Sequence, residues 1–276
     1  MVKRFSTIAI GVTLALASSM SSAVGVFKEF TIDETSIPGS GLPANANLVA
    51  DKLNGGFTEY VSFGLGNTFS AQAYASFGQL FKDDGATLVS PHLLNNFEPN
   101  GYRLYALFSA SGTVTPDLLN FTGTAAAFDL YIDTNSDTTF AGTNGFAPIT
   151  VGANSDDYKV ASSSTLAGNG VGTLSAAPGA YNFDFTAFTL TTGDQNLTLT
   201  GNQNGASYFK SPDPFHITVQ VNGDNDQATE QVGVLPPTIL VTGDVSAVFR
   251  VPEPGSLALV GLSLAALGFM GRRRRA

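Results

Sequence analysis

Apolar and polar residues alternate in short segments along the middle of this 276-residue chain. Because successive side chains of a β-strand point to opposite faces of a sheet, an alternation of period two predicts half-buried strands. The enrichment of these segments in Phe, Val and Thr also favours strands over helices. We therefore expect strands within residues 57–63, 102–109, 126–132, 183–187, 197–199, 215–221 and 245–249.

Residues 69–81 fit two patterns. Apolar residues recur there every four positions, as on one face of a helix, but also at every second position, as on one face of a strand. Gly78 disfavours a helix, so we predict a strand. Residues 153–178 are rich in Ser, Gly and Ala, a composition that predicts a long loop or a poorly ordered hairpin.

Many short strands with turn signals between them indicate a sandwich or a barrel. We predict an all-β fold: an antiparallel β-sandwich of jelly-roll or similar type, with an N-terminal signal helix and a C-terminal transmembrane helix. Asn-Gly dipeptides favour the tight turns of β-hairpins. They occur at Asn54, Asn100, Asn144, Asn169, Asn204 and Asn222.

The charge of the chain is unevenly distributed. The whole sequence has 13 basic and 22 acidic residues, for a net charge of −9. Without residues 1–23 and 251–276, 7 basic and 21 acidic residues remain, so the body carries −14. This acidity argues against binding to nucleic acid or to an anionic membrane surface, and is compatible with divalent cations and with neutral or cationic polymers. The lack of cysteine excludes disulfides, thiolate metal sites and a cysteine nucleophile.

The N-terminus has the order of a cleavable signal peptide. Lys3 and Arg4 precede an apolar run at residues 8–17, and small residues follow up to Ala23. The apolar run is only about half of the roughly 20 residues that a spanning helix needs, which argues against a retained anchor. We predict export and cleavage after Ala23.

The C-terminus combines a rigid joint, an apolar run and a cluster of arginines. Pro252, Glu253 and Pro254 disfavour a helix. The apolar residues 256–271 would form a helix of about 24 Å, and the arginines at 272–275 can extend to the membrane interface. These arginines also favour a cytoplasmic C-terminus with the body outside.

The three C-terminal parts resemble, in this order, the PEP-CTERM sorting domain of Gram-negative bacteria, with its motif at Pro252, Glu253 and Pro254. The resemblance implies processing by an exosortase after transient anchoring in the inner membrane. It also implies that the body then reaches the cell surface or the extracellular matrix and its exopolysaccharide. We divide the chain into a signal peptide at 1–23, an extracellular all-β domain at 24–250 and a sorting signal at 251–276.

The body itself has a looser resemblance to flocculation-associated PEP-CTERM proteins. It rests on the segment at residues 27–34, which reads Phe-Lys-Glu-Phe-Thr-Ile-Asp-Glu, and on the later Phe-rich strands. This resemblance implies a role in cell aggregation, as flocculation or biofilm formation.

Two groups of oxygen-bearing side chains are candidate calcium sites. Asp133, Asn135 and Asp137 alternate after a predicted strand, as in the opening of a calcium-binding loop. The glycine and the glutamate of an EF-hand are absent, so the alternative is a polar turn in which Asp and Asn bond the local backbone. The second, weaker group comprises Asp224, Asp226 and Glu230.

The body has no Gly-x-Ser-x-Gly elbow and no His-Glu-x-x-His zinc motif, and we predict that the protein is not an enzyme. His92 and His216 are its two histidines. One alternative to a matrix protein without catalytic activity is a surface glycoside hydrolase, because such an enzyme needs only two suitably placed carboxylates. A module that binds a glycan is another, since tyrosines can stack on sugar rings. The candidate tyrosines are Tyr60, Tyr74, Tyr105 and Tyr131.

Overall fold

The computed structural model describes residues 27–39, 44–94, 101–141, 148–166, 168–173, 179–185, 188–193, 203–212, 218–230 and 238–250. The predicted signal helix and transmembrane helix lie outside these residues. Within the described ranges, no helix is both long enough and apolar enough to cross a membrane.

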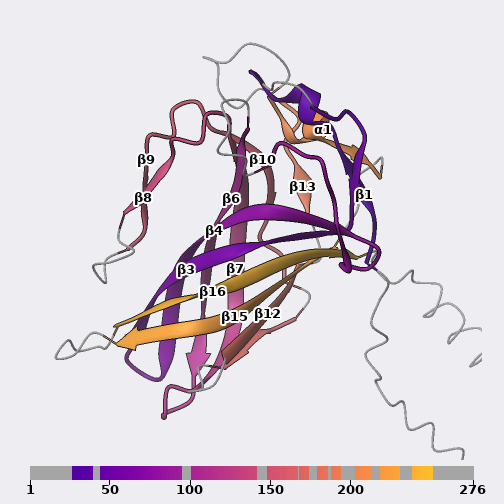
Figure 1. The fold of residues 1–276 in the computed structure, drawn as a ribbon. Coiled ribbons are helices and arrows are strands. Elements are labelled where there is room, and N and C mark those ends of the chain that lie inside the picture. Colours follow the sequence, from indigo (N-terminus) through magenta and orange to yellow (C-terminus); the bar gives the residue numbers. More distant parts are fainter. Residues whose placement is uncertain are drawn as a thin grey trace, which may run out of the picture.

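The described chain is all-β with antiparallel sheets, as predicted (Figure 1). Its long strands are β3 (Lys52–Gly64), β4 (Thr68–Lys82), β6 (Arg103–Val114), β7 (Asn120–Asp133), β15 (Thr218–Glu230) and β16 (Thr238–Arg250). The shorter strands are β1 (Phe30–Ile32), β2 (Leu48–Ala50), β5 (Thr87–Leu88), β8 (Thr139–Ala141), β9 (Thr150–Gly152), β10 (Tyr158–Ser163), β11 (Gly170–Thr173), β12 (Gly179–Phe185), β13 (Thr189–Leu190) and β14 (Phe209–Ser211). Two helical turns complete the described elements, η1 (Glu34–Ser36) and α1 (Gly205–Tyr208).

One continuous sheet replaces the two separate sheets expected of a sandwich. Its strands pair in the order β7–β11–β12–β15–β16–β3–β4–β6, and β6 pairs with β7 again, so the sheet closes on itself. Closure is possible because β7 is long enough to pair with two strands along its second edge. β11 pairs with its first half and β10 with its second half.

The interior of the closed sheet is packed with aromatic rings from strands that do not pair with one another. Phe108 of β6 contacts Phe183 of β12 at a centroid distance of 5.1 Å, and Phe128 of β7 contacts Phe185 of β12 at 5.0 Å. Neither pair of strands is adjacent in the sheet. The alternation in the sequence therefore correctly predicts that these rings lie on one face of their strands. Which ring each one contacts depends on how the sheet closes.

Residues 69–81 form a strand, as predicted, because they fall within β4. The prediction of a long loop or a poorly ordered hairpin at residues 153–178 is wrong, since β10 and β11 lie there and each pairs with β7 rather than with the other. Glycine has a packing role in β11 that composition does not reveal. A Cβ at Gly170 would lie 2.2 Å from the Phe183 ring, so only glycine lets that ring cover the strand.

The Asn-Gly dipeptide at Asn54 is not at a hairpin turn. It lies inside β3, where the register with β4 shifts between Asn54 and Gly55. The β3–β4 turn instead uses Gly66 and Asn67, which have φ angles of 75° and 57°. These positive φ angles are those that tight turns require.

A small sheet of β14, β1 and β2 is packed beside the closed sheet, with the Phe30 ring 4.5 Å from that of Phe249. In η1, which follows β1, the buried Glu34 accepts a hydrogen bond from the Leu93 amide at 2.7 Å. Burial raises the pKa of the Glu34 carboxyl, against the lowering effect of its hydrogen bonds. This carboxyl therefore ties the N-terminal segment to the chain that precedes β6.

Candidate functional site

A groove of about 650 Å³ lies on the outer face of β3, β4, β6 and β7. Strand register places its floor in two rows, because every second side chain of each strand points outward. One row comprises Tyr60, Gln72, Ser109 and Ala127, and the other comprises Ser62, Ser70, Ser111 and Ala125.

Five alanines and five serines line this groove, so small side chains keep it open and the serine hydroxyls make it partly polar. Ser62 and Ser70 form a hydrogen bond at 2.8 Å between their Oγ atoms. Pro148 and Ser164 line the groove from the segments next to β9 and β10. A row of hydroxyl and amide groups beside a tyrosine ring offers hydrogen bonds and stacking, which are the contacts that a sugar polymer can make.

The four candidate tyrosines lie on the outer face of the sheet, but they do not all line the groove. Tyr60 lines the groove. Tyr74 stacks on Phe140 of β8 with ring centroids 4.2 Å apart, and Tyr131 stacks on the buried Tyr105 with ring centroids 5.2 Å apart. Three of the four rings therefore pack against rings of the protein itself, and Tyr60 is the one that the groove presents.

Asp133 organises the turn after β7. It is fully buried, and its Oδ1 accepts hydrogen bonds from the amides of Asn135 at 3.2 Å and Ser136 at 2.6 Å. Its Oδ2 accepts one from the Thr138 amide at 3.1 Å. Asn135 Oδ1 in turn accepts from the Asp137 amide at 3.1 Å. The backbone bonding of a polar turn thus accounts for two of the three candidate calcium ligands.

Asp157 on the neighbouring segment meets the same turn. Its Oδ2 accepts hydrogen bonds from the Tyr105 hydroxyl at 2.6 Å and the Thr138 hydroxyl at 2.7 Å. Burial raises the pKa of Asp157 to about 6; the two hydrogen bonds lower it, and the charges of Asp133 and Asp156 raise it further. Burial and the hydrogen bond to Asp157 also raise the pKa of Tyr105 well above its ordinary value.

Calcium at Asp133, Asn135 and Asp137 stays a prediction. In the described part of the chain, no three His, Asp or Glu side chains form a group that could hold a metal ion. The side chains of Asp224, Asp226 and Glu230 lie outside the description, although β15 contains all three positions. Isothermal titration of the purified protein with calcium tests both groups, and the absence of both heat and a shift in melting temperature would exclude them.

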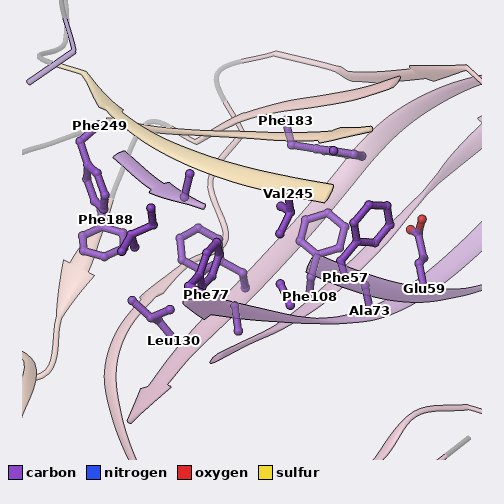
Figure 2. A pocket seen from close by; sticks show the side chains of 16 residues that line it. Phe57, Glu59, Ala73, Phe77, Phe108, Leu130, Phe183, Phe188, Val245 and Phe249 are labelled. Atoms are coloured by element: carbon purple, nitrogen blue, oxygen red, sulfur yellow. The ribbon is translucent and has the colours of Figure 1, made fainter. Parts of the chain in front are cut away.

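The closed sheet also encloses an apolar cavity of about 70 Å³ (Figure 2). Phenylalanines and small residues from both walls line it, and Glu59 lies at one end beside Phe57 and Ala73. Glu59 is 7% exposed and occupies an inward position of β3 between Phe57 and Val61. A carboxylate on an otherwise apolar inner face is unusual, because burial of a charge is costly.

The other predicted positions are dispersed. His92 lies in the loop after β5, where burial lowers the pKa of its imidazole, against a backbone hydrogen bond that raises it. His216, Ala23, Pro252, Glu253 and Pro254 lie outside the described residues. β16 ends at Arg250, so the described fold extends to within two residues of Pro252.

Sequence reasoning missed the serine rows of the groove and the role of Asp157. A period of two predicts that the serines point outward, but it does not give the register that aligns them across four strands. Asp157 meets Asp133 because β10 pairs with the end of β7, with Tyr158 opposite Ile132. That pairing lies in the segment predicted as a loop or a poorly ordered hairpin.

Comparison with known proteins identifies the tail. Residues 250–275 match the family described as the PEP-CTERM protein-sorting motif. No curated protein and no solved structure matches the chain. The match supports a PEP-CTERM protein that is exported and held by a C-terminal membrane anchor before processing in a Gram-negative bacterium.

Proposed function

We propose that the chain is a surface or matrix protein that an exosortase processes and whose body then associates with exopolysaccharide to promote cell aggregation. The observation that carries this proposal is the sorting motif at residues 250–275. It begins at the last residue of β16, so the folded body and the sorting signal adjoin with little chain between them. The proposed route is export, transient anchoring in the inner membrane, and transfer to the cell surface or matrix.

The groove on β3, β4, β6 and β7 is the surface we assign to the polymer. Its floor offers serine hydroxyls, the Gln72 amide and the Tyr60 ring over four adjacent strands. A polymer that lies across such a floor makes many weak contacts, which add up along its length. The proposal gives the body no catalytic step, so turnover of the polymer by the purified protein would contradict it.

The binding part of the proposal is tested by retention of the purified protein on exopolysaccharide from its own matrix. Tyr60→Ala combined with Gln72→Ala removes the ring and the amide from one row, and we expect at least about a threefold loss of affinity because the stacking contact is lost. Thr113→Ala is the matched control, since it lies on β6 beyond the groove. Equal loss in both variants would argue against the groove.

The sorting part is tested by deletion of residues 252–276. The deleted form should no longer be anchored or processed and should therefore differ from the wild type in location. If it reaches the same matrix location with the same mature mass, the tail does not direct sorting. Scoring floc formation after deletion of the whole gene tests the cellular role separately.

A further inference from the structure

Both ends of the described fold meet at one corner of the closed sheet. The Lys28 amide donates a hydrogen bond to the Phe249 carbonyl at 2.7 Å, and the Phe27 amide donates one to Asp84 Oδ1 at 2.8 Å. Figure 1 shows the ends of β3, β4 and β16 meeting beside β1. We call this surface the exit corner, and it comprises residues 27–29, 51–52, 81–86 and 249–250.

The chain between the exit corner and the apolar run is short. Residues 251–255 are five, so they span at most about 18 Å when fully extended. The headgroup layer takes up about 5–7 Å of that span, since a bilayer is about 40–45 Å thick around a 30 Å hydrocarbon core. The exit corner therefore stands within about 11–13 Å of the headgroups, a little more than the Debye length of about 8 Å at physiological salt.

The charges of the body are segregated with respect to this corner. Four of the seven basic residues of the body lie in it, at positions 28, 52, 82 and 250. Four acidic residues accompany them, at positions 29, 51, 83 and 84, so the corner has no net charge. The other 17 acidic residues of the body are accompanied by three basic ones. An anionic surface consequently repels the remainder of the body and not this corner.

We propose that, before processing, the exit corner docks on the anionic phospholipid surface of the membrane that holds the tail, with the far end of the closed sheet pointing away. This rests on the anchoring step of the proposed function. The short connection keeps the corner near the lipid, and the acidity of the flanks disfavours an orientation in which the body lies flat. The acidity of the body as a whole argues against its binding to an anionic membrane. Because the exit corner lacks this net negative charge, the same acidity favours the orientation in which that corner faces the membrane.

The far end of the sheet provides an internal reference. Leu65, in the β3–β4 turn, is 99% exposed. The strands between that turn and the exit corner have 13 and 15 residues, so the two ends are about 40 Å apart. In the docked orientation a probe at Leu65 therefore stays far beyond the headgroups, while a probe on the exposed Thr87, which pairs with Lys82, stays close to them.

The absence of native cysteine allows a single label at each position. The full chain with Thr87→Cys or Leu65→Cys is labelled with a fluorophore and reconstituted into vesicles of phosphatidylethanolamine and phosphatidylglycerol that contain a headgroup-linked quencher. We expect strong quenching at position 87 and at least about threefold weaker quenching at position 65, because contact with the quencher needs a short distance and the second probe lies about 40 Å farther from the headgroups. Equal quenching at both positions, or none at either on vesicle-bound protein, overturns the proposal.

A charge pair separates electrostatic docking from simple tethering. Lys28→Gln with Lys82→Gln removes two positive charges from the exit corner and should reduce the quenching at position 87. Asn67→Asp with Asn120→Asp makes the same charge change at the far end and should leave it unaltered. If the two double variants reduce the quenching equally, the docking proposal is overturned but membrane anchoring is not. If the chain does not remain with the vesicles, the anchoring step is refuted as well.

Discussion

At the scale of single residues, Asp157 shows how a carboxyl that nothing in the sequence marks becomes part of a structural junction. Because residues 153–178 were not predicted as strands, the sequence indicated no partner for Asp157. The spacing of Asp133 and Asn135, in contrast, predicted a polar turn. What the sequence lacked was the pairing of β10 with β7, which brings Asp157 to Thr138 and Tyr105. Local bonding patterns can be predicted, and contacts across strands need the register.

The raised pKa of Asp157 makes a prediction for stability. Its carboxyl binds a proton more tightly in the folded state, with a pKa of about 6 against an ordinary value of 3.8 in the unfolded chain. The folded state therefore loses stability as pH rises from about 4 to about 6, and the loss is about 1–3 kcal/mol. Asp157→Asn keeps an oxygen for Tyr105 and Thr138 but does not ionise, so its stability should lack this fall.

Urea unfolding of both proteins between pH 4 and pH 7 measures the difference. Asp137→Asn is the matched control, because it removes one carboxylate from the same turn without a contact to Tyr105. If the wild type and Asp157→Asn lose stability in parallel over this range, the Asp157 carboxyl does not carry the effect.

At the scale of elements, the sequence predicted the six long strands and β12, but it missed the other nine described strands and misassigned a turn. Asn54-Gly55 was interpreted as a turn and is a bulge within β3. A Cβ at Gly55 would lie 1.9 Å from the Ser76 carbonyl oxygen, so the close approach of β4 requires glycine there. Both a turn and a bulge select glycine, and the dipeptide alone does not distinguish them.

Two adjacent glycines allow a controlled test of this bulge. Gly55→Ala should lower the free energy of unfolding by about 2–4 kcal/mol, because the backbone must shift to admit the methyl group. Gly56→Ala should change it by less than about 1 kcal/mol, since its nearest neighbouring atom would be 3.6 Å away. Urea denaturation compares the two, and similar losses would mean that Gly55 is not held against β4.

At the scale of the whole molecule, composition predicted an all-β fold but could not choose how the strands close. The choice depends on β11, a glycine-rich segment of four residues that pairs with β7 on one side and β12 on the other. Export and the sorting tail were readable because they depend on local order and length rather than on register. The groove depends on four strands in register and so becomes visible only in the folded molecule.

The net charge of the body predicts which polymer the groove accepts. A body of −14 should prefer a polymer with free amines over a neutral one of the same backbone, because the field of the protein concentrates cationic chains near its surface. Partially deacetylated and fully acetylated poly-N-acetylglucosamine form a matched pair that differs in this charge. We expect at least about threefold tighter binding of the deacetylated polymer at low salt, with the difference lost near 0.5 M salt as screening shortens the range of the field. Co-sedimentation of the purified protein with each polymer gives both affinities. Equal affinities at low salt would show that the net charge of the body does not contribute to binding. Tighter binding of an acidic polymer such as alginate would contradict the predicted preference for cationic polymers.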